Sequence, residues 1–328
     1  MRKIFKIFFI NIVIVFLILF TLEFSARLFG LAGLMGITVD LIHDEKKRIH
    51  YIKPNSSGKV FGSNVFFDKF GYRVPSSNYI YKKKDKIILI GDSVTFGNGV
   101  IEEDTFAGIL RKSNNNFEVY NTSVFGYQVR HFNLRKDELD RFKPIKKIFY
   151  FVTLNDVFDS SNIAVKNKNE GNYENTNFKK IINLDYLRNL NIYFRDKSYF
   201  WMFLKGKIID PQKVWFKNVL NYYQQNDPKE LSIFFENLLA KSIDLKAELT
   251  VFILPYEYQT RKCGEEVLLP QKKITNILNG LKIESYDLTS VFCNQNEPKE
   301  LFYKFDPMHL SDNGHKIVYK EIKKRKLK

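Results

Sequence analysis

Residues 86–97 read KIILIGDSVTFG, an apolar run that ends in Gly-Asp-Ser and is followed by a helix-compatible stretch. A short run of Ile and Leu bounded by a glycine is typical of a parallel strand that is buried on both faces. We expect this strand to turn sharply into a helix, which puts Ser93 at the carboxyl end of the strand, where open α/β sheets bind ligands. Gly-Asp-Ser is also ordinary helix N-cap chemistry. The stretch therefore predicts a strand–helix unit but does not by itself decide the function.

Two further segments repeat this arrangement. The expected strand at 117–121 is followed by polar and small residues from Ser123 to Gly126, and the expected strand at 147–152 is followed by Asn155-Asp156. Later runs at 250–254 and 283–288 alternate with helical patterns. Alternating strands and helices indicate a parallel sheet whose strand ends share one edge. We therefore expect the three polar stretches to converge in space.

The residues that could activate a serine lie near the other end of the chain. Asp306-Pro-Met-His309 comes directly before Ser311, a natural N-cap for the closing helix. A serine nucleophile needs a neighbouring base, which a third group usually orients. We therefore predict Ser93 as nucleophile, His309 as general base and Asp306 as the group that holds the imidazole. His315 is the competing base, but it is expected inside the closing helix as a surface or packing residue.

Acyl transfer also needs preorganised donors for the negative charge that develops on the carbonyl oxygen. The backbone N–H groups of Ser93 and Gly126 and the side-chain amide of Asn155 are the predicted oxyanion hole. A glycine suits position 126 because the substrate must approach the backbone closely. Asp92 and Asp156 are expected to stabilise their turns rather than to take part in the reaction.

This ordered set of motifs resembles the SGNH hydrolases, also called the GDSL esterase/lipase superfamily. The match lies in Gly91-Asp92-Ser93, Gly126, Asn155-Asp156 and Asp306-x-x-His309, and it covers roughly residues 85–325. The third motif departs from the family's Gly-x-Asn-Asp because Thr153 stands in the glycine position. The resemblance implies a flavodoxin-like three-layer α/β/α sandwich with a parallel sheet. It also implies a serine hydrolase or acyltransferase that uses no metal and no cofactor.

The N-terminus has the pattern of a membrane segment. Arg2, Lys3 and Lys6 precede an apolar run from Ile7 to Leu22 that is about long enough to cross a bilayer. The excess of basic residues before the run predicts a cytoplasmic N-terminus and an extracytoplasmic domain, periplasmic or on the cell surface. We expect an uncleaved, single-pass signal-anchor. A cleavable signal peptide is the alternative, with a weak candidate cleavage site at residues 24–26.

These observations divide the chain into three parts. Residues 1–29 are the expected basic tip and transmembrane helix, residues 30–80 a juxtamembrane connector, and residues 81–328 the hydrolase-like domain. A helical insertion is expected at about 160–227, where an Asn-rich stretch gives way to an aromatic-rich one. It is interpreted either as a lid or substrate surface or as a satellite cluster that only packs.

Charge and cysteine content restrict the partners. The formal net charge is +16, but the basic residues are scattered and no zinc-finger or RNA-binding signature is present. We expect no nucleic-acid partner, and a basic surface near anionic lipid or glycan instead.

Cys263 and Cys293 are the only cysteines. A disulfide is feasible in an exported domain, but sequence does not supply the Cα separation that it requires. Two thiols without a histidine pattern argue against a metal site.

Three functional hypotheses follow. The leading one is a membrane-anchored serine esterase acting on acyl esters, O-acetyl groups of envelope polysaccharide in particular. The second is an O-acetyltransferase that uses the same residues and a sugar hydroxyl in place of water. The third is a non-catalytic glycan-binding module that keeps the fold, against which the intact Ser93, His309 and Asp306 argue.

Overall fold

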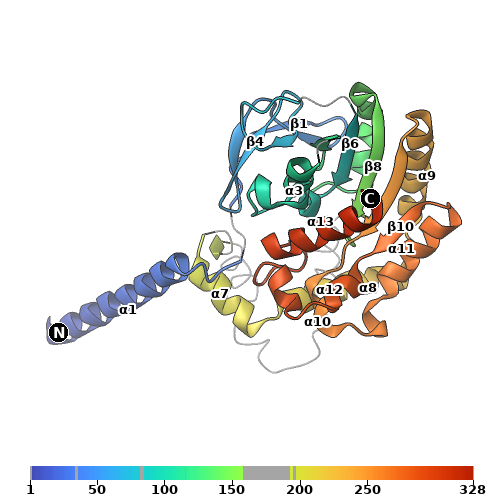
Figure 1. The fold of residues 1–328 in the computed structure, drawn as a ribbon. Helices are drawn as coiled ribbons and strands as arrows, with labels where there is room; N and C mark the ends of the chain where they lie inside the picture. The colour runs from blue at the N-terminus through green and yellow to red at the C-terminus, as the bar shows by residue number, and fades with distance from the viewer. Residues whose placement is uncertain are drawn as a thin grey trace.

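The computed structural model describes residues 2–33, 36–81, 85–114, 116–157, 193–194 and 197–327. These residues form a globular body of helices around a sheet, from which helix α1 (Arg2–Leu28) projects as a rod that carries the N-terminus (Figure 1). The C-terminus lies on the body, at the end of the closing helix.

Within the described residues, an eight-stranded sheet runs in the order β10-β9-β8-β6-β7-β5-β4-β3. Five of these strands are mutually parallel. Their bounds are β6 (Lys86–Gly91), β7 (Glu118–Asn121), β8 (Ile145–Val152), β9 (Glu248–Ile253) and β10 (Glu284–Asp287). In chain order these five are arranged 2-1-3-4-5, the flavodoxin-like order in which the first strand lies between the second and the third. The predicted flavodoxin-like parallel sheet is confirmed.

Helices cover both faces of the sheet. Phe151 and Tyr150 are neighbours on β8, so their side chains point to opposite faces. The Phe151 ring lies 4.5 Å from that of Phe106 on α3 (Phe106–Ser113), and the Tyr150 ring lies 4.8 Å from that of Phe234 on α9 (Lys229–Asp244). Helix α13 (Asp312–Lys326) joins α3 on the first face, and α4 (Val129–Arg135) joins α9 on the second. The predicted three-layer sandwich is therefore confirmed.

The remaining described helices lie around the carboxyl edge of the sheet or beside α9. They are α2 (Ser93–Phe96), α7 (Tyr199–Ile208), α8 (Pro211–Gln225), α10 (Glu257–Lys262), α11 (Leu269–Gly280) and α12 (Thr289–Cys293). Short 3-10 helices are η1 (Glu102–Asp104), η2 (Lys136–Phe142), η4 (Glu265–Val267) and η5 (Pro298–Leu301).

The structure differs from the expectation that residues 30–80 are only a connector. Three antiparallel strands from this segment extend the sheet: β3 (Ser57–Val60), β4 (Ser63–Phe67) and β5 (Arg73–Val74). Strand β5 connects these three strands to the parallel strands, through the pairing of Arg73 with Asn121 on β7. A separate hairpin, β1 (Leu41–Asp44) and β2 (Ile49–Ile52), precedes them. The segment before residue 81 is therefore built into the sandwich.

The predicted insertion is only partly within the described residues. Residues 158–192 lie outside them, whereas α7 and α8 are described. Phe216, Val219 and Tyr223 of α8 are buried in the core. The Tyr223 hydroxyl donates to the carbonyl of Leu154 at 3.2 Å. Helix α8 thus packs as part of the body and holds the loop that follows β8.

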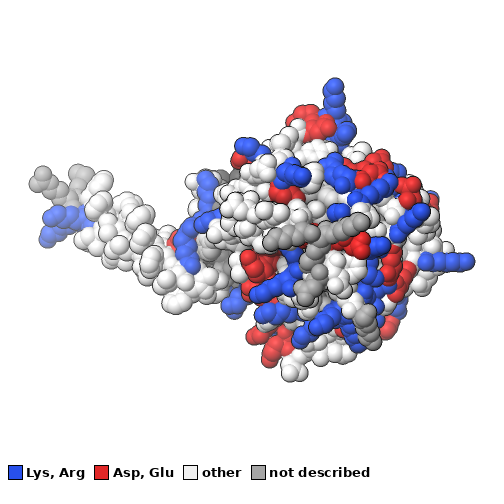
Figure 2. Space-filling model, turned by 45° about the horizontal axis from the view of Figure 1, so that its top comes forward, with Lys and Arg blue, Asp and Glu red and all other residues white. Residues whose placement is uncertain are grey.

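Helix α1 is apolar along its length. Residues Lys3–Leu28 have the length and hydropathy of a membrane span, and none of the most apolar window is buried against the body. Figure 2 shows this rod as almost uniformly white, with basic side chains gathered at its tip. On the same view, acidic and basic side chains are interspersed over the globular body.

Candidate active site

Ser93 stands at a tight strand-to-helix turn at the carboxyl end of β6. It is the first residue of α2, and the side chain of the N-cap Asp92 accepts from the Val94 N–H at 2.9 Å. A Cβ on Gly91 would lie 2.1 Å from Thr95 Oγ1, so only glycine lets the strand pass so close to the helix. Ser93 is 9% exposed, which leaves its hydroxyl at the surface of the core rather than inside it.

The structure brings Ser93, His309 and Asp306 together. Ser93 Oγ and His309 Nε2 are 2.8 Å apart, and His309 Nδ1 lies 2.8 Å from Asp306 Oδ2. The other oxygen of Asp306 accepts from the backbone N–H groups of His309, at 2.7 Å, and Met308, at 2.9 Å. An ionised carboxylate only accepts, so Nδ1 carries the proton of the neutral ring and Nε2 accepts from the serine hydroxyl. This is the arrangement that a serine nucleophile and its general base require.

Electrostatics favour a protonated imidazole here. Burial lowers the pKa of His309, but the adjacent charge of Asp306, the hydrogen bond to it and the charge of Asp92 outweigh burial, and the net pKa is raised. For Asp306, burial raises the pKa, and the charge of His309 with the backbone donors lowers it further than burial raises it. Asp306 is therefore held ionised and stabilises the imidazolium that forms when His309 takes a proton.

Asp92, Thr153 and Asp156 form a buried network beneath the nucleophile. The Thr153 hydroxyl lies 2.8 Å from Asp92 Oδ2 and 2.9 Å from Asp156 Oδ1. One hydroxyl proton cannot serve two carboxylates, so one acid must be protonated. Burial and the charge of Asp92 raise the pKa of Asp156 well above its ordinary value. Asp156 therefore donates to Thr153, which in turn donates to Asp92.

This network explains the departure of the third motif from Gly-x-Asn-Asp. Thr153 supplies a hydroxyl that a glycine lacks, and that hydroxyl links the turn after β8 to the turn that carries Ser93. Asp156 also accepts from the Thr153 N–H at 3.1 Å and from the Tyr150 hydroxyl at 2.9 Å. Asp92 and Asp156 thus have the structural positions that the sequence predicts for them.

The other two predicted oxyanion donors lie on the strand ends that flank β6. Gly126 is exposed in the loop after β7, with a φ of +77° that favours glycine. Asn155 follows β8, and its side-chain oxygen accepts from the Tyr256 hydroxyl at 2.6 Å. Burial raises the pKa of Asp92, and a hydrogen bond from the Asn155 side chain is among the contacts that oppose it. The Asn155 amide therefore lies beside the turn that carries Ser93.

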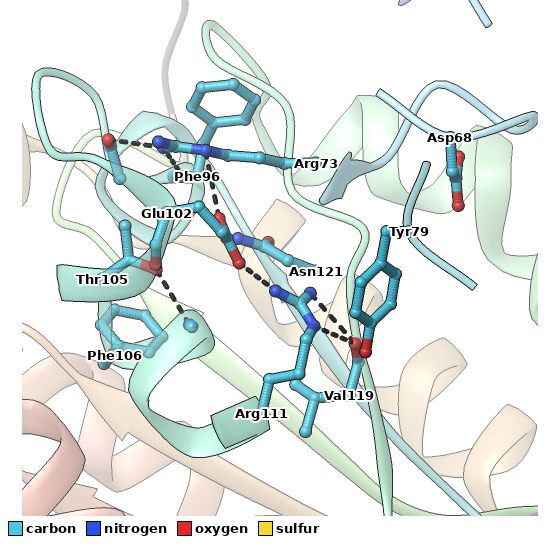
Figure 3. Close-up of polar contacts among 12 residues, drawn as sticks. Asp68, Arg73, Tyr79, Phe96, Glu102, Thr105, Phe106, Arg111, Val119 and Asn121 are labelled. Carbon is cyan, nitrogen blue, oxygen red and sulfur yellow. Dashed lines mark hydrogen bonds and ion pairs between the residues drawn. The ribbon is translucent and has the colours of Figure 1, made fainter. Parts of the chain in front are cut away.

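A buried arginine supports the loop after α2. Arg73, from β5, donates to the carbonyls of Phe96 and Gly97, each at 2.7 Å, and to that of Val100. Its Nε lies 3.1 Å from Glu102, which also pairs with the buried Arg111 (Figure 3). This Arg–Glu–Arg cluster fixes the chain directly after the nucleophile helix.

Several residues at the site could not be recognised in the sequence. Asn98, in that same loop, has its amide nitrogen 3.5 Å from His309 Nε2. The Phe61 ring lies 6.0 Å from the His309 ring, and the His50 side chain lies 3.6 Å from the position of a Cβ on Gly126. Both come from the segment expected to be a connector. Tyr256 was recognisable in principle, because it follows β9 at the edge where the polar strand ends converge.

His315 is buried in α13 and does not reach the nucleophile. Its Nδ1 accepts from the Phe106 N–H at 3.2 Å, and burial, with nearby positive charge, lowers its pKa to about 3. It packs between α13 and α3 as a neutral ring.

Cys263 and Cys293 are joined by a disulfide with a Cα–Cα distance of 5.9 Å. The bond ties the end of α10 to the end of α12, beside the loop that leads to Asp306. In the parts of the chain that the structure describes, no group of three His, Cys, Asp or Glu side chains is placed to hold a metal ion.

No family model matches the chain, and no curated protein matches it. Among solved structures, the chain is similar to a lipolytic protein of the G-D-S-L family from Veillonella parvula, with 13% identity, a TM-score of 0.43, and coverage of 74% of this chain and 99% of that one. It is also similar to a lipase/acylhydrolase from Enterococcus faecalis, with 12% identity, a TM-score of 0.41, and coverage of 74% and 96%. A third similar structure is an acetyl xylan esterase, with 13% identity, a TM-score of 0.41, and coverage of 72% and 97%.

Proposed function

We propose that this protein is a membrane-anchored, extracytoplasmic serine esterase of the SGNH type that hydrolyses acyl esters. The observation that carries the proposal is the unbroken hydrogen-bonded series from Ser93 Oγ through both ring nitrogens of His309 to Asp306, with 2.8 Å at each step. A serine that only capped a helix would not require a hydrogen bond to an imidazole, and a histidine that only packed in the core would not require one to a serine. The pair is therefore better explained by catalysis.

The reaction follows from the proton positions. Ser93 Oγ attacks the ester carbonyl carbon while its proton moves to His309 Nε2, and the resulting imidazolium is stabilised by Asp306. The same Nε2–H then protonates the leaving alcohol oxygen as its bond to the acyl carbon breaks. In the second half of the reaction, water attacks the acyl carbon while His309 takes its proton. The bond between the acyl carbon and Ser93 Oγ then breaks, His309 returns the proton to Oγ, and the carboxylic acid leaves.

The negative charge on the carbonyl oxygen needs donors that are already in position. We assign this role to the N–H groups of Ser93 and Gly126 and to the side-chain amide of Asn155. The bond from Tyr256 to the Asn155 oxygen supports the assignment, because it fixes the amide with its NH₂ group toward Asp92 and the turn that carries Ser93.

The proposed location follows from α1. An apolar helix whose first turns carry Lys3 and Lys6 would hold the domain at the outer face of a membrane. Esters within reach of such a domain are those of the cell envelope, and we propose O-acetyl groups on envelope polysaccharide as the substrate class.

The test uses the full chain in detergent or vesicles and its Ser93→Ala variant. Both are incubated with a fluorophosphonate probe and, separately, with a short-chain aryl acetate. We expect labelling and acetate release by the wild type and neither by Ser93→Ala. The matched control is Ser232→Ala, on the outer side of α9, which should behave as the wild type does. A folded wild type that is neither labelled nor active would overturn the proposal.

A second experiment with acetylated polysaccharide determines whether water or a sugar hydroxyl accepts the acetyl group. Acetate appearing in solution indicates hydrolysis, whereas acetyl groups appearing on an added sugar acceptor would replace the esterase by an acetyltransferase.

A further inference from the structure

The end of α1 is bound to the start of α7 by polar contacts. The Glu23 carboxylate accepts from the Ser198 hydroxyl at 2.7 Å and from the backbone N–H groups of Tyr199, at 3.1 Å, and Phe200, at 3.0 Å. A carboxylate that receives the free N–H groups of a helix stabilises that helix end. Glu23 is therefore an N-terminal cap for α7, supplied from a different helix.

Arg27 completes the junction one turn later. Its guanidinium pairs with Glu23 at 2.7 Å, donates to the carbonyl of Lys197 at 2.7 Å and lies 4.8 Å from the centre of the Tyr199 ring. Two charged side chains at the end of an apolar helix are thus both used to fix α7. Figure 1 shows α7 crossing the end of α1 rather than continuing its direction.

Helix α7 carries apolar side chains on the side opposite Phe305: Trp201 is half-buried beside Phe194, and two residues further along the helix are exposed. Trp201, Leu204 and Ile208 are spaced at i, i+3 and i+7, so they share one side of the helix. Leu204 is 38% exposed and Ile208 is 74% exposed. The opposite side packs on Phe305: the Phe203 ring lies 6.3 Å from its ring, and a Cβ on Gly206 would lie 2.5 Å from it.

We propose that the stripe Trp201–Leu204–Ile208 lies in the headgroup region of the same bilayer that α1 crosses, so that α7 is an interfacial helix. The inference rests on the proposal that α1 spans a membrane. A lipid surface is the partner because the stripe begins at the end of α1, where Phe24 and Leu28 are also exposed. Exposed Lys197 and Lys207 flank the stripe, as is typical of helices that lie on an anionic surface.

The arrangement also orients the candidate active site. Phe305, which packs against the inner side of α7, is the residue next to Asp306. Helix α7 therefore lies between the membrane and the loop that carries Asp306 and His309, and contact with lipid sets the distance of that loop from the bilayer.

The chain contains its own probe, since Trp201 and Trp215 are its only tryptophans. The full-length Trp215→Phe variant is reconstituted in phosphatidylcholine vesicles whose acyl chains carry bromine either near the headgroup or near the methyl end. We expect Trp201 emission to fall by roughly half with shallow bromine and less with deep bromine, as for a helix buried about 5–10 Å into the interface. The matched Trp201→Phe variant, which reports Trp215 on α8, should lose little emission.

A second variant tests the stripe itself. Leu204→Glu with Ile208→Glu, both at exposed positions, should restore most of the Trp201 emission in shallow-brominated vesicles. Equal Trp201 emission with and without bromine, in protein that floats with the vesicles, would overturn the inference. So would quenching that the double substitution leaves unchanged. Hydrolysis of a soluble aryl acetate is measured in the same samples. If Trp201 is quenched as expected but no hydrolysis occurs, the esterase proposal is wrong and the interfacial position of α7 stands.

Discussion

The Tyr256 hydroxyl donates a hydrogen bond of 2.6 Å to the side-chain oxygen of Asn155. The two residues follow neighbouring strands, β9 and β8, at the carboxyl edge of the sheet. The amide oxygen is engaged by Tyr256 and one N–H can donate to Asp92, so the second N–H of the Asn155 amide is the donor that remains for a substrate. Tyr256 would then fix the orientation of Asn155 as an oxyanion donor without itself contacting the ester.

Tyr256→Phe is expected to lower kcat for an aryl acetate about fivefold to tenfold and to leave KM nearly unchanged. One orienting hydrogen bond contributes about 1 kcal/mol, and an oxyanion contact tightens only in the transition state. Steady-state kinetics at saturating and limiting substrate separate the two constants.

The control for that substitution is Tyr258→Phe, also on α10. It should change neither constant. A rise in KM with unchanged kcat in Tyr256→Phe would contradict the orienting role and indicate a substrate-binding one.

Asp306→Asn is expected to lower kcat by about 10²- to 10⁴-fold, because the imidazole loses the partner that fixes its tautomer and stabilises its cation. The pH profile carries a second prediction. Catalysis needs neutral His309, so activity is lost as the pH falls through the pKa of His309. Burial lowers that pKa, but the charge of Asp306 raises it further.

Removing that charge lowers the pKa of His309, so the acid limb of the kcat/KM profile should move to lower pH in Asp306→Asn. The measurement is the residual activity from pH 4 to pH 9. An acid limb that stays in place while kcat falls would show that Asp306 does not act on His309 electrostatically.

Arg73→Lys is expected to lower the free energy of unfolding by about 2–3 kcal/mol and to reduce kcat. Lysine keeps the charge but lacks the planar fork that reaches three carbonyls and Glu102 together. The loop it supports includes Asn98, whose amide lies 3.5 Å from His309 Nε2, so loosening the loop disturbs the base.

Chemical unfolding and kinetics are compared with those of Arg141→Lys, an arginine that is 41% exposed and 3.8 Å from Glu138. That control should have little effect on either measurement. Wild-type kcat in a destabilised Arg73→Lys protein would mean that the cluster supports the fold without supporting the site.

Replacing both cysteines, Cys263→Ser with Cys293→Ser, is expected to reduce the free energy of unfolding by about 3–4 kcal/mol. The cysteines are 30 residues apart, and the chain-entropy treatment of a loop of that length gives this magnitude. Thermal unfolding of the wild type with and without a reductant provides the comparison. A thermal midpoint that neither the substitution nor the reductant changes would show that the bond contributes nothing to stability.

The sequence predicted the parallel part of the sheet because its strands carry strong local signals. The residues of β6 from Ile87 to Ile90 are apolar and end at a glycine, and strand β8 repeats the pattern before Asn155. Asp306 and His309 were predicted to meet Ser93 on other grounds: an activated serine needs a base and an orienting group, and these two residues lie on the loop just before the closing helix.

The N-terminal strands could not be found in this way. Strand β3 contains Ser57, Gly58 and Lys59, which have little preference for a strand, and β5 is two residues long. These strands join the parallel part of the sheet only through β5, whose Arg73 pairs with Asn121, a residue much later in the chain. The roles of Phe61 and His50 likewise arise only from tertiary contacts.

The separation of Ser93 and His309 has a consequence for the timing of activity. The two residues whose side chains meet at 2.8 Å are 216 positions apart in the sequence. A nascent polypeptide carries its serine long before the ribosome has released the histidine that activates it. A product that terminates before residue 306 keeps the strand-to-helix turn but has no base. The serine therefore stays chemically inert until His309 has been synthesised and has folded against Ser93.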